Sequence, residues 1–283
     1  MKIKEKLMKG IFLLASTVSI LAVILICIFL FANGIPAIKE IGLSEFLLEK
    51  DWRPVGNPPT FGILPMIMGS IYVTAGAIII GVPIGVLTAV FMAKYCPPWL
   101  YRYLKPAINL LAGIPSVVYG FFGLVIIVPY IMKVSGGTGT SMLAASILLG
   151  IMILPTIIGV SESAIKAVPM SYYEGSVALG ASHERSIFFT VLPAAKSGIM
   201  TAIVLGIGRA IGETMAVIMV AGNQPRMPKG LLKGVRTLTA NIVIEMGYAG
   251  ELHRDALIAT GVVLFVFILI INLLLSLLKR GLD

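Results

Sequence analysis

The sequence predicts an all-α protein that crosses a membrane six times. Of its 283 residues, 58% are hydrophobic and only 12% are charged, and the mean hydropathy is +1.01. This composition lies far outside the range of soluble domains. A hydropathy window of about 19 residues finds six apolar segments long enough to cross a bilayer. They are residues 11–32, 63–93, 106–132, 142–165, 197–221 and 256–278.

The charges flanking these segments predict the orientation of the chain. Lys and Arg are enriched in cytoplasmic segments of membrane proteins, and they occur in the N-terminal MKIKEKLMK and at Lys279 and Arg280. We therefore expect a multi-pass protein of the cytoplasmic (inner) membrane with both termini in the cytoplasm. The net charge of +9 lies mostly between the apolar segments, so it indicates topology and contact with lipid and not nucleic-acid binding.

The sequence divides into two parts. We expect residues 1–62 to form an N-terminal anchor helix and a first outer loop, with a short amphipathic helix in AIKEIGLSEFLLEKDW. The apolar stretch that ends at Ala32 is too long for a signal peptide and lacks an A-x-A cleavage site. Residues 63–278 are expected to form the transmembrane core, with a cytoplasmic hairpin at 166–196.

The second and third apolar segments contain five prolines: Pro65, Pro83, Pro106, Pro115 and Pro129. Helix-breaking residues are tolerated in a bilayer where the freed backbone groups meet protein or a water-filled cavity. The prolines favour a transport pathway over a simple anchor, and kinked helix packing is the alternative.

The segment 197–221 carries Arg209 and Glu213 near its middle, and Arg209 is the only Lys or Arg in any of the six segments. Residues i and i+4 share a helix face, so the sequence predicts an ion pair between these side chains. Two interpretations remain open. The pair lines a path for a substrate anion, or it is a static contact that fixes helix packing.

The segment 166–196 predicts two short helices joined by a turn. Ser171 and Glu174 have the spacing of a capping box, Gly180 is expected to end the first helix, and Ser182 is expected to begin the second. Exposed apolar side chains on such a hairpin indicate that a partner covers it.

This hairpin resembles the EAA loop of ABC importer permeases. Glu174, Gly180, Leu192 and Pro193 keep the spacing of that motif. In the family the loop inserts into a groove on a cytoplasmic ATPase, so the resemblance assigns these four residues to ATPase coupling. A capping role alone is the alternative for Glu174.

Three positions depart from the EAA pattern. Gly175 and Ser176 replace the two alanines, and Thr190 replaces an aliphatic residue. These departures weaken the match of the motif but leave its remaining residues in register.

Further segments resemble the PstC-type permease of the phosphate-specific ABC importer, over about residues 50–278. They are LPMIMGSIYVT (64–74), AGIPSVVYGFFGL (112–124), LGIGRAIGETMAV (205–217) and AGNQP (221–225). The resemblance implies a type I ABC importer permease fold and translocation of inorganic phosphate. It also implies three partners, which are a PstA-type permease that completes a heterodimer, a dimeric PstB-type ATPase and a PstS-type phosphate-binding protein.

The chain is not expected to be an enzyme or to hold a metal or cofactor. It contains no Gly-Lys dipeptide and therefore no Walker A loop, so ATP hydrolysis is assigned to the partner ATPase. His183 and His253 lie in loops without a second ligand at metal-binding spacing, and Cys27 and Cys96 suggest no disulfide.

Several alternatives stay open from the sequence. The runner-up is a permease for another oxyanion, such as sulfate or molybdate, and a secondary transporter or an intramembrane enzyme fits the sequence less well. The outer loop 223–254 has four basic residues that could steer an acidic face of a binding protein, or be merely solvated. They are Arg226, Lys229, Lys233 and Arg236.

Overall fold

The computed structural model describes residues 2–280 and is mostly helical. In chain order its elements are α1 (Lys2–Ile41), α2 (Leu43–Leu48), β1 (Trp52–Arg53), β2 (Thr60–Phe61), α3 (Leu64–Val90), the π-helical η1 (Phe91–Tyr95), α4 (Pro98–Gly113), α5 (Ser116–Phe122), the π-helical η2 (Gly123–Ile127), α6 (Val128–Ser135), α7 (Met142–Lys166), α8 (Met170–Ala178), α9 (His183–Ser186), the π-helical η3 (Ile187–Val191), α10 (Leu192–Ala194), α11 (Lys196–Gly212), α12 (Met215–Val220), α13 (Leu238–Glu245) and α14 (Glu251–Arg280).

Within the described residues, five helical segments are long and apolar enough to cross a membrane. They are Lys4–Ile41, Leu64–Tyr95, Ser116–Ser135, Met142–Lys166 and Glu251–Leu274. A sixth consists of two helices, His183–Ala194 and Lys196–Gly212, that meet at an angle of 68°. The structure confirms the predicted all-α class with five to six membrane-spanning helices, while several predicted boundaries are wrong.

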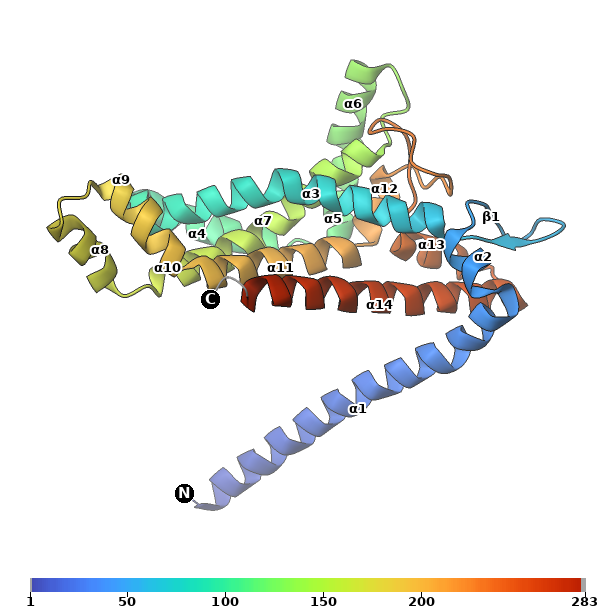
Figure 1. Cartoon of the computed structure of the whole chain (residues 1–283), viewed down its shortest axis with the longest axis horizontal. Helices are drawn as coiled ribbons and strands as arrows, with labels where there is room; N and C mark the ends of the chain where they lie inside the picture. Colours follow the sequence, from blue (N-terminus) through green and yellow to red (C-terminus); the bar gives the residue numbers. More distant parts are fainter. Residues whose placement is uncertain (1, 281–283) are drawn as a thin grey trace.

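The long helices run between two ends of the molecule (Figure 1). The hairpin of α8 and α9 lies at one end, and the small sheet, α2 and α13 lie at the other. We call these the hairpin end and the sheet end. Helix α1 begins and α14 finishes toward the hairpin end, so the two described ends of the chain share a side, as an even number of crossings requires.

The central core is formed where α3 packs along α7 and α7 along α11. Glycines bring these helices together. A Cβ at Gly81 would lie 2.7 Å from Ile153 Cδ1, and one at Gly85 would lie 2.8 Å from Ile157 Cγ2. Ile157 also packs against Gly206 of α11. Small residues at helix crossings are typical of membrane bundles, where close packing replaces the hydrophobic effect.

Helix α1 extends well beyond the predicted span 11–32 and passes through Pro36. Its C-terminal half packs on α14, where the rings of Phe31 and Phe265 meet edge to face with centroids 5.9 Å apart. Most side chains of its N-terminal half are exposed. The short helix expected after it is present as α2.

The sheet end has its own apolar core. Strands β1 and β2 are antiparallel and pair Trp52 with Phe61. Both side chains are buried, together with Phe46 of α2 and Leu257 of α14. The segment between α1 and α3 is therefore folded onto α14, the last helix.

The predicted span 106–132 is not one helix. Helix α4 ends at Gly113, and the backbone of Ile114 (ψ 127°) and Pro115 (ψ 141°) is extended before α5 begins. Proline has no N–H group and disfavours the helical conformation of the residue before it. The chain therefore leaves the helix at this point and resumes in a new direction.

The predicted span 197–221 is also broken. Helix α11 ends at Gly212, Glu213 is extended with φ −69° and ψ 133°, and α12 begins at Met215. Helices α5 and α12, which follow the two breaks, pack on each other. A Cβ at Gly120 of α5 would lie 2.6 Å from Met219 Sδ and 3.0 Å from Ala216 Cα, so the two short helices are in direct contact.

Gly120→Ala should destabilise this contact. The Met219 side chain can move, but Ala216 Cα belongs to the backbone, so we expect a cost of about 1–3 kcal/mol from overpacking. Thermal unfolding of the purified protein in detergent measures it. Gly159→Ala is the matched control, because a Cβ at this helical position meets nothing within 4 Å. Equal melting temperatures for the two variants would contradict the packing of α5 on α12.

Candidate functional site

The two helix breaks lie in one buried region. Tyr119 of α5, Ala210 of α11 and Ala216 of α12 belong to the same apolar cluster, and Ile114 packs against it. Interrupted helices inside a membrane protein occur where the backbone is buried in protein or lines a cavity. We call residues 111–119 and 209–216 the break region.

Side chains satisfy backbone groups that the first break releases. The Tyr119 hydroxyl donates a hydrogen bond of 2.8 Å to the carbonyl oxygen of Leu111. This bond reaches across the break from α5 back to the last turn of α4. Tyr119 therefore fixes the angle at which α5 leaves α4.

The second break is held by three hydrogen bonds. Glu213 Oε1 accepts from the backbone N–H of Ala216 at 3.2 Å, and Thr214 Oγ1 donates to the Gly212 carbonyl oxygen at 3.2 Å. Thr239 of α13 donates to the carbonyl oxygen of Glu213 at 3.1 Å. The Glu213 side chain thus caps α12, because a side chain that bonds to nearby backbone competes with helix continuation.

The predicted ion pair between Arg209 and Glu213 is wrong. Within residues 2–280 no ion pair of 4.0 Å or less joins them. The reason is the break itself, because the i,i+4 geometry requires a continuous helix through Glu213.

Arg209 is a half-buried cation in the last turn of α11. Its Nη1 donates to Thr156 Oγ1 of α7 at 3.4 Å, which is long for a hydrogen bond of this type. The partial negative charge at the C-terminal end of a helix favours a cation at this position. Among the described residues the guanidinium makes this one hydrogen bond, to Thr156, so most of its donors remain available.

The hairpin has the predicted turn but a different start. Gly180 ends α8 with φ +87°, a conformation that favours glycine. Ser182 caps α9 by accepting from the backbone N–H of Arg185. The predicted capping box at Ser171 is wrong, because α8 begins at Met170 after Pro169 and Ser171 already lies inside the helix.

The other predicted coupling residues lie along the hairpin. Glu174 and Pro193 are exposed, and Leu192 is partly buried against the apolar cluster beneath the hairpin. Two of the departures from the EAA pattern meet each other, since Thr190 Oγ1 donates to Ser176 Oγ at 3.3 Å. These polar replacements therefore join α8 to η3, the π-helical segment that follows α9.

His183 connects the hairpin to the end of η1. Its Nδ1 lies 2.8 Å from the Tyr173 hydroxyl, and its ring meets Tyr95 edge to face with centroids 5.1 Å apart. Among the described residues no group of three or more His, Cys, Asp or Glu side chains could hold a metal ion.

The sequence reasoning missed a buried carboxylate in α7. Glu162 is only 2% exposed and accepts hydrogen bonds from Tyr101, Lys105 and Lys166. We call these four residues the Glu162 cluster. A signal was available, because Glu162 is an ionisable residue inside the predicted span 142–165, as Arg209 is inside its own.

A second buried carboxylate, Glu245, lies at the sheet end. It accepts from Trp52 Nε1 at 2.8 Å, lies 2.9 Å from His253 Nε2 and pairs with Arg236. This corrects the prediction that Arg236 is free to steer a partner, since only 11% of its side chain is exposed. Arg226, Lys229 and Lys233 are exposed, as expected.

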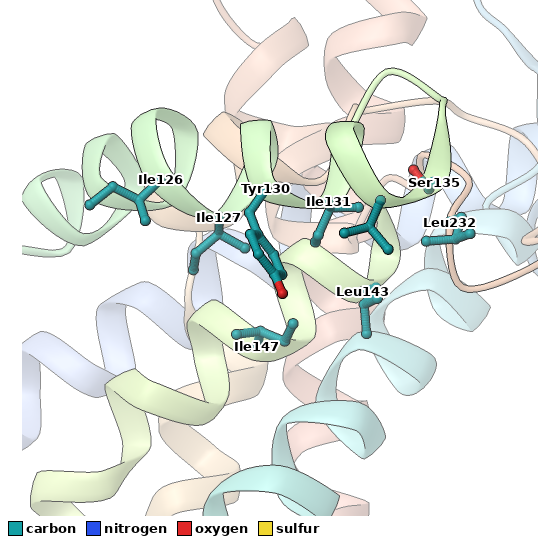
Figure 2. A pocket seen from close by; sticks show the side chains of 9 residues that line it. Ile126, Ile127, Tyr130, Ile131, Ser135, Leu143, Ile147 and Leu232 are labelled. Carbon is teal, nitrogen blue, oxygen red and sulfur yellow. The ribbon is translucent and has the colours of Figure 1, made fainter.

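An apolar cavity of about 580 Å³ lies between α6 and α7 (Figure 2). Side chains of η2 and α6 line it from one side and Leu143 and Ile147 of α7 from the other, with Leu232 at its edge. Among the described residues that line it, Tyr130 and Ser135 are the ones with polar side chains. A site without a cation cannot compensate the charge of an anion, so the break region and not this cavity is the candidate substrate site.

Glu245→Gln should destabilise the sheet end. The amide presents an N–H₂ group either to Arg236 or to the donors of Trp52 and His253, and it removes the charge that pairs with a nearly buried guanidinium. We expect a loss of about 3 kcal/mol in unfolding free energy, measured by thermal unfolding in detergent. Glu40→Gln, at an exposed position of α1, is the control. Equal stability of both variants would contradict the pairing described for Glu245.

Several known proteins are similar to this chain in sequence. Residues 81–283 match the family described as binding-protein-dependent transport system inner membrane component. The probable ABC transporter permease protein YqgH of Bacillus subtilis (strain 168) is 43% identical over 268 residues, which cover 92% of this chain and 87% of that protein. The phosphate transport system permease protein PstC of Mesorhizobium japonicum is 34% identical over 267 residues, covering 87% and 81%.

A solved structure agrees with these relatives in fold. A chain of the bacterial alginate ABC transporter, in complex with its alginate pentasaccharide-bound periplasmic protein, superposes with a TM-score of 0.65 at 16% identity. The match covers 95% of this chain and 94% of that one. The fold is that of a type I ABC importer permease. With its family model matched over residues 81–283, this chain belongs to the inner membrane components of binding-protein-dependent transport systems.

Proposed function

We propose that this chain is the permease subunit of an ATP-driven importer that moves inorganic phosphate across the cytoplasmic membrane. The relatives named as phosphate permeases support phosphate, while the relative from Bacillus subtilis is named only as a probable ABC transporter permease. A secondary transporter is not compatible with the family. The choice of phosphate over sulfate or molybdate therefore has to be argued separately.

The observation that carries the proposal is that Arg209 is a half-buried cation whose charge the described residues compensate only in part. Phosphate crosses as an anion, and a low-dielectric bundle must compensate its charge without binding it too tightly. Arg209 has a planar set of donors that suits tetrahedral oxyanions. In the part of the chain that the structure describes it makes one long hydrogen bond, to Thr156, and it lies one turn before a helix break. We propose that it contacts the anion during passage.

Glu213 favours phosphate over the alternative oxyanions. Hydrogen phosphate carries a proton and can donate it to a carboxylate, whereas fully ionised sulfate or molybdate offers only acceptors. We propose that Glu213, whose Oε1 accepts a hydrogen bond from the backbone N–H of Ala216, lines the same pathway. Its negative charge would repel anions that have no proton to donate to it. This role replaces the predicted ion pair with Arg209.

The partners follow from the same proposal. The hairpin, with Glu174, Gly180, Leu192 and Pro193, would face the cytoplasm and dock on a dimeric ATPase of the PstB type. A PstA-type permease would complete the membrane heterodimer, and a PstS-type binding protein would deliver phosphate at the sheet end. Both termini would then be cytoplasmic, because the two ends of the described chain lie toward the hairpin end (Figure 1). We also propose residues 1–62 as an anchor segment distinct from the core at 63–278.

Arg209→Gln should abolish phosphate uptake by the assembled transporter. The change removes the compensating charge at similar volume, so the anion loses its favourable interaction in the pathway. Uptake of radiolabelled phosphate into proteoliposomes containing the full transporter is the measurement. Arg209→Lys keeps the charge but loses the bidentate fork, and we expect uptake reduced roughly tenfold, the effect of one charge-assisted hydrogen bond.

The control for Arg209 is Arg254→Gln, at an exposed position of α14. The Arg209 variants should assemble as well as this control, and their ATP hydrolysis should still respond to the loaded binding protein. Normal uptake by Arg209→Gln, or loss of the subunit from the membrane, would refute the pathway role.

Gly180→Val should weaken the docking of the ATPase. Nothing lies within 4 Å of a Cβ at this position, but φ is +87°, so valine would strain the backbone by about 1–2 kcal/mol and misorient α8 against α9. Gly180→Asn is the matched control, because asparagine tolerates this conformation. Co-purification of the ATPase measures the effect. Equal recovery with valine and asparagine would rule out docking through this hairpin.

A further inference from the structure

The Glu162 cluster is a set of short, charge-assisted bonds around one buried carboxylate. Tyr101 Oη and Lys166 Nζ donate to Oε1 at 2.6 and 2.7 Å, and Lys105 Nζ donates to Oε2 at 2.6 Å. Lys166 also donates to the Tyr101 hydroxyl at 2.9 Å and lies 4.0 Å from the centre of its ring. Both carboxylate oxygens are thus held in fixed directions.

The cluster joins α4, which is followed by the first break, to α7, which is followed by the hairpin. Tyr101 and Lys105 are one turn apart on α4, and α4 leads directly to the break at Ile114 and Pro115. Lys166 is the last residue of α7, and the hairpin helix α8 begins four residues later, at Met170. The cluster therefore lies where the base of the hairpin meets the helix that precedes the break.

Apolar packing extends this connection into the hairpin. Ile108 of α4, Ile158 and Ile165 of α7, and Ile187 and Val191 of η3 form one buried cluster. The second half of the hairpin, the end of α7 and the body of α4 are consequently packed as one unit. A displacement of the hairpin is transmitted to α4 as long as α4 stays fixed on α7.

Stability alone does not require an ionised group at this position. Burying a carboxylate costs several kcal/mol, and replacing a buried ionic cluster by well-packed apolar residues is often neutral. What charge-assisted bonds add is direction, because they hold the donors and acceptors in one geometry. A carboxylate held by donors from α4 and α7 fixes the register of these two helices.

We propose that Glu162 is a positioning residue that couples the ATPase-binding hairpin to the break region. It keeps α4 in register with α7, so that movement of the hairpin displaces α4, then α5 and the α12 helix packed on it, and thereby the surroundings of Arg209. This inference rests on the proposed function, because it requires that the hairpin docks on an ATPase and that the break region lines the pathway.

The test compares stimulated with basal ATP hydrolysis in the full transporter. Glu162→Gln should lower the melting temperature, because it removes a buried charge that pairs with two lysines, but the assembled transporter should hydrolyse ATP without binding protein as the wild type does. Its stimulation by the phosphate-loaded binding protein should fall roughly tenfold, the effect of losing one charge-assisted hydrogen bond. A purely structural residue would change assembly or melting temperature and leave the ratio of stimulated to basal hydrolysis unchanged. Wild-type stimulation in Glu162→Gln would overturn the proposal.

A second variant decides the matter if Glu162→Gln does not assemble. Lys105→Met removes one bond to α4 and leaves Glu162 bonded to Lys166 and Tyr101, so folding should be preserved and stimulation should fall in part. Arg102→Met, an exposed cation on the same helix, is the matched control. Equal stimulation of the Lys105 and Arg102 variants would overturn the proposal.

Failure of the proposed function would look different. If the wild-type transporter does not respond to the phosphate-loaded protein, the phosphate assignment is wrong. The same variants, compared with sulfate-loaded or molybdate-loaded binding protein, would still test whether Glu162 couples the hairpin to the break region.

Discussion

The structure depends on one constraint, that every backbone polar group inside a membrane must find a partner in the protein or in a water-filled cavity. Two of the predicted spans are interrupted, 106–132 at Ile114 and 197–221 at Glu213, and each interruption releases carbonyl and N–H groups. Tyr119 reaches back to Leu111 across the first break, and the Glu213 carboxylate caps the helix after the second. The two short helices that follow then pack on each other. The break region is thus held in place by hydrogen bonds and by the packing of α5 on α12.

The protein holds its ionisable groups Glu162, Glu245 and Arg209 in two different ways. Glu162 and Glu245 are nearly buried and fully bonded, and each connects segments distant in sequence. Within residues 2–280, Arg209 instead has a single long hydrogen bond, to Thr156, and it lies at the C-terminal end of a helix, whose dipole favours a cation. A charge that the protein compensates only in part can exchange partners with a passing anion, whereas a fully paired charge cannot. This difference is why we assign the pathway to Arg209 and a positioning role to Glu162.

Local rules in the sequence predicted much of this fold. Hydropathy located the apolar segments. Glycine at position 180 correctly predicted the end of the first hairpin helix, and Ser182 was correctly placed at the start of α9. The same rules failed at Glu213, where a helical i,i+4 pattern was overridden by a side chain that caps the next helix. They could not find the contacts of Glu245, since its partner Trp52 lies 193 residues away in the sequence. Glu162 could be singled out as an ionisable residue within a span, but its link to α4 depends on Lys105, 57 residues earlier.

The central claim is that the break at Glu213 lies on a path that anions enter and that Arg209 attracts them there. Thiol modification at this break tests the claim most directly. Gly212 is exposed and has open space for a side chain, so Gly212→Cys can be introduced after Cys27 and Cys96 are replaced by alanine. In the assembled transporter, an anionic methanethiosulfonate reagent should react with this thiol faster than a cationic reagent of similar size. The preference should disappear when Arg209 is replaced by glutamine. Equal rates for both reagents, or a thiol that reacts with neither, would contradict the account.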